Sequence, residues 1–493
     1  MTAIPSRPLL RRLGWELIFL LVSASAAWSS PWAETGDNRL RTDVELLGTA
    51  DVINGVTTHW PLPWTSIAHD LRNADTAGQS DAIQDAASRL LDQAERENRP
   101  GLSAAAVLAA TNNPSVIYGF DGLGRGDGET ALSVAYNSSD VAGRLSVGEF
   151  TQSFSGHDTK LMLDGSYVAA KLGDEALVYA GWLDHWWGPG WISALSLSNS
   201  ARPMPQIGIQ RLDTSASSWP VVNLLGPWQL EFFVGLLDGP RIERHTFYNA
   251  LRLTFNPTPD LEIGLARTEE FCGQGHPCSP IRDYFHFANN PNSLDNTNDE
   301  AAWDLKYRHT LGRVPFQVYL QLMNEDYSWF NHSGTSHLFG VTAFLPVREN
   351  PLRLTLEFSD SIATLHPFSF GDNIYGFSYT NYQFLDGMRY RGRTLGLSLD
   401  DDSTLLSLQG SWSDSDGRFY ELSFHHATIG NSHTPPGNNI LSPVPVLLNL
   451  GEARISLPWQ GWKFDLAARL QDDRPRPAHG FEASGELGVH LDF

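Results

Sequence analysis

The sequence predicts a mostly β protein: a transmembrane antiparallel β-barrel of about 18 strands with a small N-terminal helical bundle on its periplasmic side. Three observations support this fold class. The chain opens with an export signal, long stretches alternate apolar and polar residues with a period of two, and the last alternating stretch ends in Phe493. No segment after the signal has 18 consecutive apolar residues, so transmembrane helices are not expected there.

The composition of the 493-residue chain excludes several other classes of protein. Its 34 basic residues are outnumbered by 56 acidic ones, and a net charge of -22 argues against a nucleic-acid partner. The 25 Phe, 14 Tyr and 16 Trp residues are too many for a disordered chain. A mean hydropathy of -0.25 excludes a helical membrane protein. It is compatible with a barrel, which averages a lipid-facing apolar row and a polar luminal row.

Residues 1–27 have the pattern of a signal peptide. Arg7, Arg11 and Arg12 form a positive region, residues 13–22 are largely apolar, and small residues follow. The apolar stretch is too short to cross about 30 Å of hydrocarbon as a helix. We therefore expect the chain to leave the cytoplasm and to lose this segment.

The two cysteines of the chain, Cys272 and Cys278, are separated by five residues. In an oxidising compartment this spacing predicts a disulfide that closes one loop. The alternatives are free thiols or a metal site, but a metal would need more ligands than the two cysteines and His276. We expect neither a metal nor another cofactor.

Residues 28–115 are predicted to form the periplasmic helical segment. Residues 40–47 and 83–94 repeat apolar side chains at helical spacing, and a stop signal follows at 98–101. The Ala-rich run 102–111 is expected to be a further helix. A helix lying on the membrane surface is the alternative, which the acidic polar faces disfavour.

From residue 116 to residue 493 the hydrophobic period is two, which predicts strands with one apolar and one polar face. The clearest examples are residues 230–236, 251–255, 352–358, 406–412 and 462–470. In a membrane barrel the polar faces line a hydrated lumen, whereas in a soluble sandwich they face bulk water. The export signal, the strand length and the aromatic residues near strand ends favour the barrel.

The last strand carries a further mark of an outer-membrane barrel. Apolar residues step back by two from Phe493, and this resembles the C-terminal signal that such barrels present to their insertion machinery. We therefore expect that machinery and outer-membrane lipids as partners. Strands and connections of about ten residues each give an even strand number near 18. The short turns at 414–417 and 459–461 are expected on the periplasmic side, and the long runs 429–449 and 471–480 outside.

Several motifs resemble the capsule assembly Wzi family. They are GWLDHWWGPGW at 181–191, LSNSARPMP at 197–205, and shorter strings at 40–47, 58–64, 267–275 and 390–396. WGPG and SNSARPMP are the more specific, and the resemblance runs from about residue 40 to the C-terminus. It implies an 18-stranded outer-membrane barrel with a periplasmic helical bundle. It also implies a lectin that helps to attach capsular polysaccharide to the cell surface. We expect a surface or capsular polysaccharide as partner, and a monomer.

The loop at 182–204 is the predicted glycan site. Glycan binding uses aromatic faces that stack on sugars, and carboxylate or guanidinium groups that hydrogen-bond to hydroxyls. The candidate residues are Asp184, Trp186, Trp187, Trp191 and Arg202. Alternatively, these tryptophans lie in an interfacial girdle or pack the loop inside the barrel.

A second candidate site is a row of arginines. Arg389, Arg391 and Arg393 are expected on one face of a strand, where Arg391 and Arg393 could hold an anionic glycan. A luminal ion-pair ladder is the alternative. Residues 400–402, three consecutive aspartates, are expected to form a solvated turn rather than a calcium site.

An enzyme and a general porin are the rival functions. The adjacent carboxylates of Glu269 and Glu270 point to opposite faces of a strand, unlike the converging pair of a glycosidase. No G-x-S-x-G motif is present, so we expect no enzyme. A porin would have an open lumen, whereas the long loops, the helical segment and the many tryptophans predict an occluded one.

Overall fold

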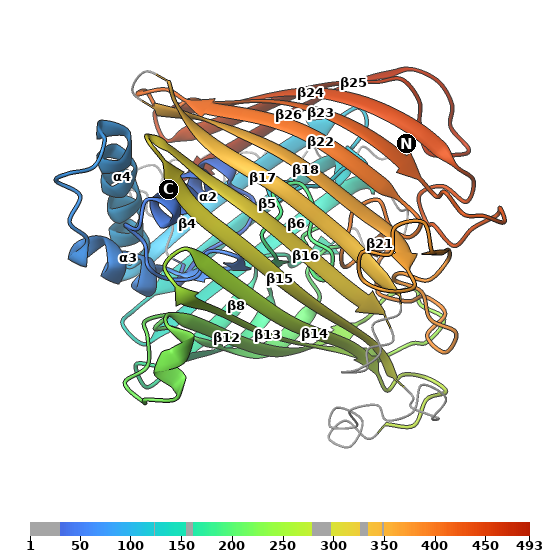
Figure 1. Ribbon diagram of the computed structural model, residues 1–493, viewed down its shortest axis with the longest axis horizontal. Helices are drawn as coiled ribbons and strands as arrows, with labels where there is room; N and C mark the ends of the chain where they lie inside the picture. Colours follow the sequence, from blue (N-terminus) through green and yellow to red (C-terminus); the bar gives the residue numbers. More distant parts are fainter. Residues whose placement is uncertain (1–29, 123, 154–160, 279–296, 326–333, 348–349) are drawn as a thin grey trace, which may run out of the picture.

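The computed structural model describes residues 30–122, 124–153, 161–278, 297–325, 334–347 and 350–493. The predicted signal peptide, residues 1–27, lies outside this part of the chain. Antiparallel strands of the described residues form one closed barrel (Figure 1). None of the helices described combines the length and the apolar character needed to cross a membrane.

Within the described ranges, eighteen strands of six or more residues form the barrel wall, and β26 pairs with β4 to close it. Two further strands of two residues each, β7 (Leu161–Met162) and β19 (Asn373–Ile374), pair antiparallel with β6 and β18. The predicted strand number is confirmed. The wall strands are β4 (Gly101–Thr111), β5 (Gly126–Asn137), β6 (Val141–Ser153), β8 (Tyr167–Leu172), β9 (Ala176–Trp182), β11 (Pro205–Arg211), β12 (Trp228–Leu237), β13 (Thr246–Thr258), β14 (Leu261–Phe271), β15 (Thr297–Leu311), β16 (Val314–Glu325), β17 (Thr335–Val347), β18 (Asn350–Thr364), β22 (Thr404–Ser413), β23 (Phe419–Ile429), β24 (Val446–Trp459), β25 (Trp462–Gln471) and β26 (Glu482–Asp492).

The barrel begins earlier than the predicted boundary at residue 116. Residues 101–111 form the strand β4 and not a helix. Alanine favours a helix by intrinsic propensity, but β4 pairs with β5 on one side and β26 on the other. This pairing in the sheet outweighs the local preference. The predicted 28–115 segment is therefore wrong at its end, because the last helix stops at Glu97.

The strands carry the predicted two faces. Leu408 of β22 is 53% exposed on the outside, whereas its neighbour Gln409 is buried in the lumen. Leu356 and Glu357 of β18 show the same alternation. An apolar band around a closed barrel is the lipid-facing surface of an outer-membrane protein. The fold is therefore the membrane barrel and not a soluble sandwich.

The two ends of the barrel differ. The helices and the C-terminus lie at one end (Figure 1), which we refer to as the helix end. Its hairpin turns include the short connections 259–260, 312–313 and 460–461. The opposite end, the loop end, carries the long connections 183–204, 365–403 and 430–445. Outer-membrane barrels have short periplasmic turns and long external loops, so this asymmetry agrees with a periplasmic helical bundle.

The N-terminal segment enters the lumen from the helix end. It contains β1 (Trp32–Ala33), α2 (Asn38–Thr49), β2 (His59–Trp60), β3 (Leu62–Pro63), α3 (Trp64–Asn73) and α4 (Asp81–Glu97). Asp37 caps α2 by accepting hydrogen bonds from the backbone N–H groups of Arg39 and Leu40. Ten residues of α2 are buried, and the helix contacts β15 and β16 of the wall.

Residues 183–204 enter the lumen from the loop end. Their short strand β10 (Trp186–Trp187) pairs antiparallel with β2, with Trp186 opposite Trp60 and Trp187 opposite His59. We refer to residues 30–64 and 183–204 together as the luminal plug. Because segments from both ends meet inside the barrel, most of the lumen is filled with protein, as predicted.

Candidate functional site

The predicted tryptophans Trp186, Trp187 and Trp191 lie inside the luminal plug and are at most 1% exposed. The ring centroid of Trp191 lies 4.4 Å from the guanidinium of Arg41 and 3.8 Å from that of Arg353. Trp187 packs edge-on against the ring of His59. Desolvated cation–π contacts contribute about 2 kcal/mol each. These three side chains stabilise the plug and offer no accessible ring face to a sugar, in line with the alternative of packing inside the barrel.

The tight backbone of the WGPG motif explains its glycines. Gly188 has a φ of 142°, in the region that favours glycine. A Cβ at Gly190 would lie 2.1 Å from the carbonyl oxygen of Ser193. The carbonyl oxygen of Pro189, between the glycines, accepts a hydrogen bond from Nη2 of Arg41 at 3.1 Å. The motif therefore folds the loop back on itself and attaches it to α2.

Buried charges of the wall hold the N-terminal half of the plug. Nζ of Lys306 in β15 lies 3.0 Å from Oε2 of Glu45 in α2 and 3.3 Å from Oε2 of Glu262 in β14. Glu262 also accepts hydrogen bonds from the backbone N–H groups of Thr57 at 3.0 Å and Thr58 at 2.8 Å. Such buried charges are tolerated only when they are paired and hydrogen-bonded. The polar luminal row therefore fixes the position of the plug.

One wall carboxylate holds the other half of the plug. Glu357 of β18 accepts hydrogen bonds from the backbone N–H groups of Trp191 (2.7 Å), Ile192 (3.1 Å) and Ser193 (2.7 Å). The hydroxyl of Tyr319 donates a further bond at 2.9 Å. The loop that the sequence assigned to glycan binding is thus anchored through its own backbone.

Asp184 and Arg202 belong to an ion-pair network on the loop-end side of the plug. Arg202 donates to both carboxylate oxygens of Asp164, at 3.0 and 2.8 Å. Arg125 donates to Asp184 at 3.2 Å and lies 3.9 Å from Asp164. The side chain of Asp184 is 30% exposed and that of Arg202 is 7% exposed. Of the two, Asp184 is the more accessible to a ligand.

The arginine row is not one strand, which corrects the sequence prediction. Residues 389–394 form a small hairpin, β20 (Arg389–Tyr390) and β21 (Arg393–Thr394), inside the connection between β18 and β22. Arg391 lies at its turn with a φ of 50°, so the three side chains do not share a strand face. The turn arises because Gly392, with a φ of 76°, reverses the chain.

Arg389 and Arg391 are held by aspartates, as in the ion-pair alternative. Arg389 donates to both carboxylate oxygens of Asp400, at 2.9 and 3.1 Å. Arg391 donates to Oδ1 of Asp238 at 3.1 Å. The guanidinium of Arg393 lies 5.8 Å from the ring centroid of Tyr118.

The aspartates at 400–402 are at most 1% exposed, so the prediction of a solvated turn is wrong. Asp400 holds Arg389, and Asp402 accepts the backbone N–H of Gly376 at 2.9 Å. Burial and the neighbouring carboxylates raise the pKa of Asp401 to about 9. In the described part of the chain, no group of three or more His, Cys, Asp or Glu side chains could hold a metal ion.

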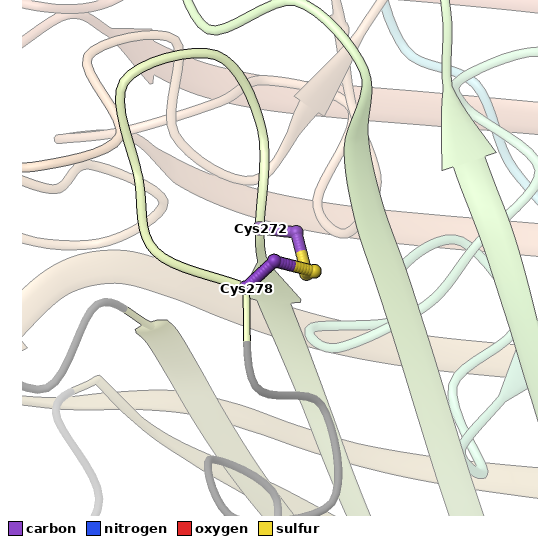
Figure 2. The surroundings of a disulfide bond; sticks show 2 residues. All are labelled: Cys272 and Cys278. Atoms are coloured by element: carbon purple, nitrogen blue, oxygen red, sulfur yellow. A yellow bond between two sulfur atoms is a disulfide. The ribbon is translucent and has the colours of Figure 1, made fainter.

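Three connections pack together at the loop end: residues 238–245, 272–278 and 381–391. The backbone N–H of Ile242 donates to Asp386 at 2.6 Å. The ring of His276 stacks on that of Phe384 with centroids 4.3 Å apart. The predicted disulfide between Cys272 and Cys278 is confirmed and closes the second connection (Figure 2).

These connections form what we refer to as the outer loop surface: Asp238, Ile242, Tyr382, Leu385, Asp386 and Arg391. Tyr382 is 72% exposed, and the side chain of Asp238 is 44% exposed beside Arg391. The surface combines an exposed aromatic ring with carboxylates and a guanidinium, which are the two kinds of contact that sugars require. Of the predicted site residues, this surface includes Arg391. Tyr382 was missed, because it lies within the long connection between β18 and β22 and belongs to none of the motifs that marked candidate residues.

The family to which the chain belongs is decided by a match over most of its length. Residues 96–474 match the family model described as capsule assembly protein Wzi. The chain belongs to the capsule assembly Wzi family. This Wzi family is known for capsule assembly and not as a family of enzymes.

Two further comparisons agree with membership of the Wzi family. The chain is 27% identical over 334 residues to an uncharacterised 55.8 kDa protein in the cps region of Klebsiella pneumoniae. That match covers 65% of this chain and 64% of the Klebsiella protein. The structure resembles Wzi of Escherichia coli, an outer-membrane protein involved in group 1 capsule assembly and described as a carbohydrate-binding β-barrel. The TM-score is 0.81 at 21% identity, covering 94% of this chain and 100% of the other, which shows a shared fold.

Proposed function

We propose that this Wzi-family protein is a lectin-like outer-membrane protein that binds a surface or capsular polysaccharide and contributes to capsule assembly. The observation that carries the proposal is the outer loop surface, presented at one end of a barrel whose lumen is largely filled. Membership of the Wzi family, and the carbohydrate binding ascribed to the Escherichia coli protein, support the same function.

The outer loop surface has the chemistry of a sugar site. The exposed ring of Tyr382 can stack on the C–H face of a pyranose, and Ile242 and Leu385 extend the apolar area. Asp238 and Asp386 can accept hydrogen bonds from hydroxyls, and Arg391 can donate them. Because these groups are already placed by hydrogen bonds between connections, little ordering is required on binding.

The predicted loop residues contribute indirectly in this proposal. Trp186, Trp187 and Trp191 are positioning residues, since they hold the plug that supports the loop end. Arg202, within the plug, and Arg393, in the hairpin at 389–394, are both buried, and Asp184 contacts a ligand only if one enters the lumen. Catalysis is not part of the proposed function, and the plug argues against the porin alternative because it fills the path a solute would follow.

The proposal is tested by binding of polysaccharide purified from the source strain to the protein in lipid nanodiscs. Tyr382→Ala is expected to weaken binding at least fivefold, because an aromatic contact contributes about 1 kcal/mol. Asp238→Asn is expected to weaken binding as well, because it replaces a charged hydrogen-bond acceptor with a neutral one. Tyr307→Ala serves as the matched control, since Tyr307 is a half-exposed aromatic outside this surface. Unchanged binding by both folded variants would disprove the assignment. Whole-cell glycan staining with and without the protein tests the cellular role.

A further inference from the structure

A cavity of about 700 Å³ lies between the luminal plug and one side of the barrel wall. The lining includes residues of β24, β25, β26, β4 and β5 on the wall side, and residues 30–40 of the plug on the other. It reaches from Asp37 and Lys463 at the helix end to Asp184 and Asn199 of the plug's loop-end half. It is therefore separate from the outer loop surface.

The Ala-rich strand β4 explains why this space is present. The buried luminal positions of β4 include Ser103 and Ala105, and the strand contributes Val107 and Ala109 to the cavity lining. Elsewhere the wall fills the lumen with side chains as large as Arg353 and Glu357. Small side chains on β4 leave a gap that the plug does not fill.

The cavity opens at the helix end. The side chains of Asp37 and Lys463 at its rim are 42% and 40% exposed, and that of His490 is 35% exposed. Deeper in the cavity, Tyr118 is only 6% exposed. A solute from the side of the helical bundle can therefore reach these groups without passing the loop end.

The polar groups at the rim are arranged with room between them. Nζ of Lys463 lies 3.7 Å from Oδ2 of Asp37 and 3.8 Å from Oδ2 of Asp465. These separations exceed the usual N–H···O distance of about 3.2 Å. A hydroxyl group at this position could donate to a carboxylate and accept from the ammonium. Next to them, His490 lies 3.0 Å from Asp465.

The charge of the lining selects among ligands. Among the lining residues described there are nine carboxyl groups and five arginine or lysine side chains, so the carboxylates remain in excess even when Glu97 is protonated. This excess of negative charge repels a polyanion at close range. It does not oppose an uncharged ligand with many hydroxyl groups, for which carboxylates are strong hydrogen-bond acceptors.

We propose that this cavity is a second saccharide site, open toward the helical bundle, that binds an uncharged, hydroxyl-rich segment of a glycan. The inference rests on the proposed function and extends it, because it gives the protein a glycan site at each end of the barrel. Val107 and Ala109 supply an apolar floor for sugar C–H groups. Asp37, Lys463 and Asp465 supply hydrogen bonds at the rim.

Thiol protection tests the site directly. The native cysteines are joined in a disulfide, so Val107→Cys provides a single reporter thiol on the cavity floor. Neutral oligosaccharides are prepared by partial hydrolysis of the source strain's polysaccharide and separated from acidic ones by anion exchange. In nanodiscs, the neutral fraction is expected to slow modification by a small methanethiosulfonate reagent at least fivefold and saturably. Arg313→Cys, in an exposed turn at the same end, is the matched control and is expected to react at an unchanged rate.

A second variant tests whether protection of the reporter thiol depends on the rim residues of the cavity. Lys463→Ala in the Val107→Cys background is expected to abolish protection, and binding of the intact polysaccharide at the outer loop surface is expected to persist. The inference is overturned if Val107→Cys does not react, if neutral fragments give no protection, if only acidic fragments protect, or if Lys463→Ala leaves protection unchanged. If the wild-type protein does not bind the intact polysaccharide, that result contradicts the proposed function instead.

Discussion

The indole ring of Trp191 contacts the guanidinium groups of Arg41 and Arg353, one from the plug and one from the wall. Replacing it with alanine removes both cation–π contacts and leaves a cavity, at an expected cost of about 3–5 kcal/mol. Trp191→Phe keeps an aromatic face and is expected to cost less. Hydrogen exchange of residues 38–49 and 183–204 measures the effect. Unaltered exchange in Trp191→Ala would show that these contacts do not stabilise the plug.

Glu97, at the end of α4, is expected to make the attachment of the N-terminal segment depend on pH. Its carboxylate accepts the backbone N–H of Ser30 at 3.2 Å. Burial, with a further contribution from Glu34, raises its pKa to about 8, although Arg144 and Arg96 oppose the shift. In an unfolded chain the pKa of a glutamate is about 4.3. Between these values the folded state binds more protons, so its stability is greatest below this range and falls as pH rises.

The expected loss of stability as pH rises can be measured by hydrogen exchange. We expect hydrogen exchange of residues 30–37 to become roughly tenfold faster or more between pH 5 and pH 8. The rates are divided by those of the unfolded chain at each pH, which removes the intrinsic pH dependence of exchange. Glu97→Gln, which resembles the protonated side chain, is expected to remove this dependence. Glu95→Gln, a half-exposed neighbour on α4, is the matched control. An equal pH dependence in Glu97→Gln and the wild type would contradict the assignment.

At the scale of elements, α2 is held by charges rather than by apolar packing alone. Lys306→Met keeps the length of the side chain but leaves Glu45 and Glu262 without their shared cation. Breaking a buried pair in this way costs about 3–5 kcal/mol. We expect faster hydrogen exchange in α2 and a lower melting temperature, whereas the exposed Arg313→Met changes neither. Exchange in α2 as slow as in the wild type would show that Lys306 is dispensable.

The sequence predicted most of the wall because one face of each strand meets lipid and the other meets polar groups. Leu408 and Gln409 obey this alternation, and so do the predicted strands around them. The Ala-rich strand β4 was not predicted as a strand, because a run of alanines shows no clear alternation of apolar and polar residues. Its pairing with β26 and β5 makes it a strand.

The candidate site was harder to predict because it depends on contacts between distant connections. The residues of the WGPG loop have the composition of a sugar site, but Glu357 and Arg353, far along the chain, hold that loop inside the lumen. Asp238 is joined to the connection that carries Tyr382 through Arg391, in the hairpin at 389–394. Local patterns contain no information about which connections meet at the end of a barrel.

For the whole molecule, the filled lumen predicts electrical behaviour. Because the plug occupies the lumen, purified protein in planar bilayers is expected to show no large, stable currents. The variant Trp191→Ala/Lys306→Met, which loosens both halves of the plug, is expected to show intermittent openings. Trp412→Ala/Arg313→Met, with changes away from the plug, is the matched control. Large, steady conductance of the wild type would favour the porin alternative.

The way the plug is attached also constrains the order in which the molecule assembles. Lys306, Glu262 and Glu357 meet plug groups inside the barrel. A wall that closed first would enclose water around these charges, and the plug would then have to displace this water from a barrel without an open seam. The seam between β26 and β4 joins the last strand of the chain to the first strand of the wall. We therefore expect the seam to close last, with the wall wrapping around a plug already in place.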